Sequence, residues 1–326
     1  MIRASSILDR VLVLEMVRVT EAAAIAAARM VGRGDEKAAD AAAVDAMRTA
    51  LNQLPMDGTI VIGEGERDEA PMLYIGEKVG NAQDGGPKID IALDPLEGTT
   101  ITAKAGPNSL AVLAIAEGGG LLNAPDVYME KLAIGPGYPP GTIDLDKSVA
   151  DNISAIAAAK GVDPVDITAC VLDRDRHAGI IAELRAIGCA IHLISDGDVA
   201  GVIATTDPDT GIDVYLGTGG APEGVLAAAA LACIGGQIQG RLLFRNDDER
   251  ARAKRWGITD LDRVYALEDM AMGDCIFAAT GVTDGSLLKG IRRRKGGCVT
   301  SETIVMRASS GTIRRVFTEH RHGVAS

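Results

Sequence analysis

Two groups of carboxylates follow short β-branched segments in the first hundred residues. In the stretch VIGEGERDEAP, Glu64 stands between two glycines directly after an apolar segment. In IDIALDPLEGTT, Asp90, Asp94 and Glu97 fall within eight residues and are followed by Gly98 and Thr99. Clustered carboxylates repel one another, and hard cations such as Mg²⁺ and Mn²⁺ remove that cost. The pattern predicts two strand ends that share metal ions beside a phosphate.

Each acidic segment also has a plainer interpretation, a solvated turn at the surface. The first stretch contains three further acids that fit a solvated charge run, namely Glu66, Asp68 and Glu69. A charge run does not explain why Glu64 lies between glycines after a strand. In the metal interpretation Pro95 fixes a turn, Gly98 lets backbone approach a ligand, and Thr99 begins a helix or supplies a hydroxyl.

The elements that position these residues follow from hydrophobic periodicity. Apolar residues recur at helical spacing over 7–30 and again over 35–54, before Pro55. Strands are expected at 59–63, 89–94 and 109–116. Because no helix separates the last two, a mixed or antiparallel sheet is expected there.

The later half alternates strands and helices. Strands are expected at 166–173, 190–195, 212–217 and 275–281, and helices at 176–187, 199–205 and 221–234. This alternation predicts an α/β layered fold. The helix-breaking sequence AKGVDP suggests a boundary between an N-terminal lobe (1–162) and a C-terminal lobe (163–326).

Composition limits the function. The chain has 326 residues, 47% hydrophobic but only 3% aromatic, which suits an aliphatic core of helices packed on sheets. The net charge of 33 − 45 = −12 argues against nucleic acid as a partner. No apolar run has the roughly 18 residues of a membrane span, and the N-terminus lacks a signal-peptide core. The five cysteines form no CxxC pair, so buried thiols in a cytoplasmic protein are expected.

The stretch GEGERDEAPMLYIGE, followed by DIALDPLEGTT, resembles the GlpX-type, or class II, fructose-1,6-bisphosphatases. The segment DPLEGT also fits the wider lithium-sensitive, metal-dependent phosphatase superfamily, which alone would leave inositol monophosphatases open. The similarity continues through GRGD, NAPDVYMEKL, DRDRH, SDGDVA, GTGGAPEGV and ATGVTDGSLLKGI. It implies an α-β-α-β-α sugar-phosphatase fold and a homo-oligomer, either dimer or tetramer. The implied reaction is gluconeogenic hydrolysis of the 1-phosphate of fructose 1,6-bisphosphate, with two or more Mn²⁺ or Mg²⁺ ions per site.

The resemblance also implies roles for individual residues. Asp40 and Glu64 would bind one metal, and Asp94, Glu97 and Glu223 another. Thr99 would orient the attacking water, with Glu64 and Asp94 as the other catalytic residues. The sugar and its phosphates would contact Glu97, Gly98, Thr99, Tyr128, Arg174, Asp175, Arg176, Asp196, Gly197, Asp198 and Gly220.

Several alternatives stay open. Asp40 could be an exposed helical residue, His177 a structural histidine, and IRRRK a solvated face or subunit contact. Glu36 occupies the position after GRGD where family members usually carry lysine, so a role for that lysine is in doubt. Sedoheptulose-1,7-bisphosphatase, alone or as a second activity, and a non-catalytic sugar-phosphate sensor are the competing functions.

Overall fold

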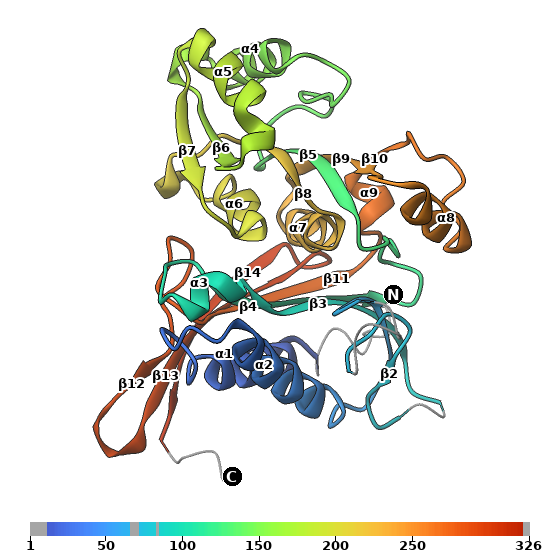
Figure 1. The fold of residues 1–326 in the computed structure, drawn as a ribbon, viewed down its shortest axis with the longest axis vertical. Helices are drawn as coiled ribbons and strands as arrows, with labels where there is room; N and C mark the ends of the chain where they lie inside the picture. Colours follow the sequence, from blue (N-terminus) through green and yellow to red (C-terminus); the bar gives the residue numbers. More distant parts are fainter. Residues whose placement is uncertain (1–11, 66–71, 83–84, 322–326) are drawn as a thin grey trace. The chain divides into compact units, whose positions relative to one another are not determined.

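The computed structural model describes residues 12–65, 72–82 and 85–321, which form two compact units (Figure 1). Unit 1 combines residues 1–121 with 273–326, and unit 2 is the continuous segment 122–272. The boundary predicted at residue 162 falls inside unit 2, because strands on either side of it share one sheet. The acids Glu66, Asp68 and Glu69 lie outside the described residues, as does the start of the first predicted helix.

Unit 1 is built on an eight-stranded sheet with the order β12-β13-β11-β4-β3-β1-β2, in which β14 also pairs with β13. Its strands are β1 (Asp57–Ile62), β2 (Lys78–Val79), β3 (Lys88–Glu97), β4 (Leu110–Glu117), β11 (Cys275–Gly281), β12 (Arg292–Arg293), β13 (Val299–Arg307) and β14 (Thr312–His320). The pairing of β11 with β4 joins the two chain segments of this unit.

The core of unit 1 lies between this sheet and two helices. The helices α1 (Val13–Ala27) and α2 (Glu36–Leu51) lie side by side on one face, as Figure 1 shows. Met16, Met47 and Ile91 are fully buried in this layer. The short helix α3 (Thr99–Ala103) connects β3 to β4, which pair antiparallel as the sequence predicted.

Unit 2 contains a six-stranded sheet with the order β10-β9-β5-β8-β6-β7. Its strands are β5 (Tyr128–Ile134), β6 (Thr168–Leu172), β7 (Ala190–Ile194), β8 (Val214–Gly220), β9 (Gln237–Leu243) and β10 (Val264–Ala266). Its α-helices are α4 (Val149–Lys160), α5 (Ala178–Ile187), α6 (Asp198–Ala204), α7 (Ala221–Ile234), α8 (Asp247–Arg255) and α9 (Leu267–Met270).

The sheet of unit 2 is covered on both faces. Leu132 and Ile134 of β5 pack into one apolar cluster with residues of α4 and α5. Alternate residues point to the opposite face, where Met129 and Lys131 lie against Gly224 of α7. Helix and sheet layers in both units confirm the predicted α/β class. No helix in the described ranges is long and apolar enough to cross a membrane, and four of the five cysteines are buried.

Candidate active site

Parallel pairing of β1 and β3 brings the two acidic segments to one edge of the unit 1 sheet. Ile62 at the end of β1 is in register with Ala92 of β3. Glu64 and Asp94 each lie two residues beyond this pair, so both emerge at the same end of neighbouring strands. The two neighbouring parallel strands therefore carry Glu64 and Asp94 at the same end, and the sharing of metal ions between them stays a prediction.

Strand β3 does not end at Asp94, as the sequence suggested, but continues to Glu97 through a shift of register. Asp94 is half-buried, and its Oδ1 accepts the Leu96 N–H at 3.0 Å. The Glu97 side chain is buried, and therefore it does not belong to an exposed loop. Gly98 is left-handed, with φ of 84°, and α3 begins at Thr99 as predicted.

Asp40 is held beside this edge by the GRGD segment. The Asp35 carboxylate accepts the Ala38 N–H at 3.0 Å and begins α2. The amides of Gly32 and Gly34 donate to carbonyls of α3 at 2.9 and 3.0 Å. These bonds tie α2, which carries Asp40, to α3, which carries Thr99. Glu36 is an exposed first-turn residue of α2.

Asp40 and Glu64 share an unfavourable electrostatic environment. Burial raises the pKa of Glu64 to about 8, and the charge of Asp40 adds to this effect. Burial also raises the pKa of Asp40. A cation between or beside two such carboxylates would relieve both costs.

A hydrogen bond to Leu73 holds the Glu64 backbone in place. The Glu64 N–H donates to the Leu73 carbonyl at 3.0 Å, and a side chain at Gly63 would collide with that carbonyl. Leu73, at φ of 53°, donates its N–H to the buried Glu77 carboxylate. Arg48 of α2 pairs with Glu77 at 2.6 Å. The glycine before Glu64 is therefore required by close packing.

The remaining predicted metal ligand, Glu223, lies in the first turn of α7. Its Oε2 is buried and has no hydrogen-bond donor among the described residues. Burial and then the charge of Asp198 raise the pKa of Glu223 to about 7. A Cβ on Gly220 would lie 1.9 Å from the Glu223 Oε2, so a side chain at this position would displace the Glu223 carboxylate.

Asp198 is a buried ion-pair residue. The Lys131 ammonium, only 1% exposed, donates to the Asp198 carboxylate and to the Gly220 carbonyl, the latter at 2.8 Å. Gly197, with φ of 84°, precedes α6, and no side chain caps that helix. Asp196 is half-buried and lies 4.0 Å from Arg174.

The DRDRH segment begins the turn before α5. Arg174, Asp175 and Arg176 are exposed, and the Arg176 Nε and Nη2 donate to the Thr218 carbonyl of β8 at 3.0 and 2.8 Å. The Arg176 guanidinium lies 5.1 Å from the centre of the Tyr128 ring. Of the residues predicted for a second phosphate, the structure thus brings Arg176 and Tyr128 together.

His177 has the structural role that was one of its two interpretations. Its Nδ1 lies 2.7 Å from the Leu172 carbonyl, and the Thr218 N–H donates to Nε2 at 2.7 Å. Both ring nitrogens are therefore used by a neutral imidazole. Burial lowers the pKa of His177, although the hydrogen bond to Leu172 opposes this.

Two residues of this region, Lys131 and Arg245, were not predicted from the sequence. Lys131 stands in an alternating strand, where a charged residue normally indicates solvent exposure. Arg245 follows β9 and lies 5.3 Å from the Tyr128 ring centre. The only local indication of Arg245 as a site residue was the segment GRLLFRNDDER, in which an apolar run ends in charged residues.

The donor sets fit divalent metal ions chemically, since they consist of carboxylates, and burial raises the pKa of three of them, Asp40, Glu64 and Glu223. Within the described ranges no three acidic, histidine or cysteine side chains converge in metal-binding geometry. The observed arrangement is the Asp40–Glu64 pair and the neighbouring β3 carboxylates in unit 1, with Glu223 in unit 2.

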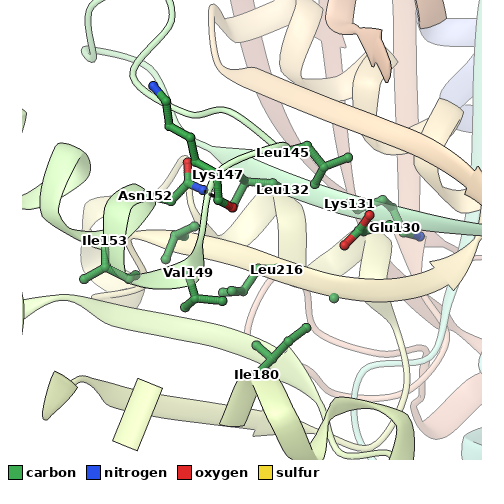
Figure 2. A pocket seen from close by; sticks show the side chains of 12 residues that line it. Glu130, Lys131, Leu132, Leu145, Lys147, Val149, Asn152, Ile153, Ile180 and Leu216 are labelled. Carbon is green, nitrogen blue, oxygen red and sulfur yellow. Dashed lines mark hydrogen bonds between the residues drawn. The ribbon is translucent and has the colours of Figure 1, made fainter. Parts of the chain in front are cut away.

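A small cavity of about 90 Å³ lies elsewhere in unit 2, between β5, β8 and the helices α4 and α5 (Figure 2). Its lining is largely aliphatic and includes Leu132, Val149 and Ile180. None of the site residues predicted from the sequence lines it, but Lys131, the ion-pair partner of Asp198, does.

Comparison with known proteins agrees with the resemblance. The family of bacterial, glpX-encoded fructose-1,6-bisphosphatases matches residues 10–320. The chain is 50% identical over 325 residues to fructose-1,6-bisphosphatase 1 class 2 of Escherichia coli K12, with 95% of each chain covered. The class 2 enzyme of Shigella flexneri shows the same identity and coverage.

Two solved structures are more distant. SuhB of Bartonella henselae matches with a TM-score of 0.33 and 15% identity, over 62% of this chain and 74% of its own. Inositol monophosphatase of Anabaena matches with a TM-score of 0.31 and 16% identity, over 60% and 71%. The family match and the 50% identity, each over nearly the whole chain, show that this chain belongs to the glpX-encoded, class 2 family of bacterial fructose-1,6-bisphosphatases.

Proposed function

We propose that this protein hydrolyses the 1-phosphate of fructose 1,6-bisphosphate to give fructose 6-phosphate and phosphate. The observation that supports this most directly is the parallel pairing of β1 with β3, which places Glu64 and Asp94 at one sheet edge. The 50% identity to class 2 fructose-1,6-bisphosphatases supports the choice of substrate. No observation favours sedoheptulose 1,7-bisphosphate or a non-catalytic sensor.

The proposed metal ligands are Asp40, Glu64, Asp94 and Glu97 of unit 1 and Glu223 of unit 2. Bound Mn²⁺ or Mg²⁺ ions, two or more per site, would neutralise charge on the phosphoryl oxygens and on the leaving alkoxide. The raised pKa values of Glu64 and Glu223 support this assignment, because a cation compensates the cost of keeping buried carboxylates ionised.

Thr99 is proposed to orient the attacking water with its hydroxyl. Its place at the start of α3, directly after Glu97 and Gly98, supports this role, because the bonds from Gly32 and Gly34 hold α3 in position. The second phosphate is proposed to bind to the side chains of Tyr128, Arg174 and Arg176. Asp175, Asp196, Gly197, Asp198 and Gly220 complete the proposed sugar-phosphate contacts.

The test is phosphate release from fructose 1,6-bisphosphate with added Mn²⁺ or Mg²⁺, and again with excess EDTA. We expect activity only with metal, and a loss of about 10²-fold or more in kcat for Glu64→Gln and Asp94→Asn. Asp90→Asn is a control, because the Asp90 Oδ2 accepts the Gly119 N–H at 2.7 Å and so holds the turn that follows β4. Full activity in EDTA would refute the metal-dependent reaction.

The expected homo-oligomer and cytoplasmic location are also proposals. On β14, Phe317 is 61% exposed and Ile313 is 51% exposed, and apolar side chains on a strand of this kind support contact with a second copy. Light scattering during size exclusion tests this: Phe317→Glu should shift the assembly toward monomer, whereas a wild-type monomer would refute the proposal.

A further inference from the structure

Two guanidinium groups lie over the same aromatic ring in unit 2. The Arg176 and Arg245 guanidinium carbons are 5.1 and 5.3 Å from the centre of the Tyr128 ring. Tyr128 begins β5, the strand that pairs with β8 on one side and β9 on the other. Arg176 is anchored to β8, and Arg245 lies two residues after Leu243, the β9 partner of Tyr128. The two cations therefore approach the ring from the two neighbouring strands.

Arg245 is fixed in place by a buried carboxylate. Its Nε and Nη2 lie 2.7 and 2.6 Å from the Glu249 Oε1, and its backbone N–H donates to the Glu249 Oε2 at 2.7 Å. Glu249 is 1% exposed, and Asn246 accepts its N–H at 2.9 Å at the start of α8. A buried carboxylate that receives three donors holds its arginine without help from a ligand.

Both arginines keep donors for a ligand. Arg176 uses Nε and Nη2 for the Thr218 carbonyl, and Arg245 uses the same two nitrogens for Glu249. Among the described residues, neither Nη1 group has a hydrogen-bond acceptor. A guanidinium offers five N–H donors in a planar fork, which suits phosphate oxygens.

We propose that Arg245 binds the non-scissile phosphate of the substrate together with Arg176 and Tyr128, and so determines the preference for a sugar bisphosphate. This inference rests on the proposed function and adds to it a specificity residue from a different part of the chain. Glu249 is then a positioning residue that orients Arg245. A dianionic phosphate is the ligand that two guanidinium groups beside one aromatic ring recognise best, through charge-assisted hydrogen bonds.

The test compares fructose 1,6-bisphosphate with fructose 1-phosphate, which lacks the second phosphate. For Arg245→Ala, we expect kcat/KM for the bisphosphate to fall about 10- to 100-fold, mainly through KM, because the contact exists in ground and transition states. For fructose 1-phosphate the change should stay below about 3-fold. For Arg245→Lys, kcat/KM for the bisphosphate should lie between the values for wild type and Arg245→Ala, since lysine keeps the charge but lacks the planar guanidinium that Glu249 holds.

Two further variants control for folding. Arg245→Ala leaves the Glu249 carboxylate buried without its ion pair, so the double variant Arg245→Ala/Glu249→Gln repeats the test without that charge. Arg250→Ala removes an arginine of α8 whose side chain is 48% exposed and lies 3.7 Å from Asp247, and this variant should match wild type with both substrates.

The outcomes separate this inference from the proposed function. Equal loss with both substrates, or wild-type discrimination in the double variant, would overturn the role of Arg245. If wild type hydrolysed neither substrate, the proposed function would fail, and calorimetry with fructose 6-phosphate would still decide the inference. Binding weakened about 10-fold or more by Arg245→Ala supports it, and unchanged binding refutes it.

Discussion

Replacing Lys131 by methionine should destabilise unit 2 strongly, although the change keeps an unbranched apolar stem. Lys131 is fully buried in β5, and its ammonium pairs with Asp198, whose side chain is 8% exposed. The same ammonium donates to the Gly220 carbonyl at 2.8 Å. Methionine removes both interactions and leaves the Asp198 carboxylate without its cation.

The size of the effect follows from this burial. Removing one partner of a buried ion pair costs about 3–5 kcal/mol, because the other charge stays behind without compensation. That loss is a large part of the roughly 5–15 kcal/mol by which most domains are stable. The carboxylate of Glu223 increases the penalty, since Lys131 lowers the pKa of Glu223.

Urea unfolding followed by circular dichroism measures the change. With an m-value of about 3 kcal/mol/M, the midpoint should fall by about 1–2 M. The double variant Lys131→Met/Asp198→Asn should recover about 1–3 kcal/mol, because it no longer buries a lone charge. Lys147→Met is the matched control: this lysine is 57% exposed and 3.7 Å from Asp144, and its loss should cost less than about 1 kcal/mol.

Two results would contradict the reasoning. If Lys131→Met unfolded within about 1 kcal/mol of wild type, the buried pair would not stabilise this sheet. If the double variant were less stable than Lys131→Met alone, the orphaned Asp198 charge would not be the cause of the destabilisation.

Three shorter predictions concern pH, catalysis and support of the site. Burial lowers the pKa of His177, so the folded protein favours the neutral imidazole, and the stability that this gives is complete above the ordinary pKa of 6.5 and is lost as the pH falls below that value. The Tm should therefore drop between pH 7.5 and 5, and it should drop less in His177→Asn. Thr99→Ala should lower kcat about 10²–10⁴-fold with little change in KM, and Thr99→Ser should restore part of it; an unchanged kcat would limit Thr99 to starting α3. Glu77→Ala should raise the Mn²⁺ concentration for half-maximal activity and reduce stability by about 1–3 kcal/mol, because Leu73 loses the acceptor that positions it against Glu64; an unchanged metal requirement would separate Glu77 from the site.

The sequence by itself determined the elements whose ends are encoded locally. The helix predicted at 221–234 is α7, which has Pro222 in its first turn and a left-handed Gly235 at its end. Helix α2 begins after Asp35, whose carboxylate caps it. Glu64 could be placed just after a strand for the same reason, because β-branched residues and the following glycine mark the end of β1. Pro95 did not mark the end of β3 in the same way, since this strand continues to Glu97 through a shift of register.

Only the tertiary structure decided which distant segments meet. Strand β5 was not predicted, since it buries Lys131 among apolar residues, and a buried lysine is favourable only beside Asp198, a partner far along the chain. The division into units likewise depends on the pairing of β11 with β4, two strands that all of unit 2 separates along the chain. Arg245 meets Tyr128 because β5 lies between β8 and β9, and a strand order of this kind is fixed by packing over the entire sheet, with no mark in the local sequence.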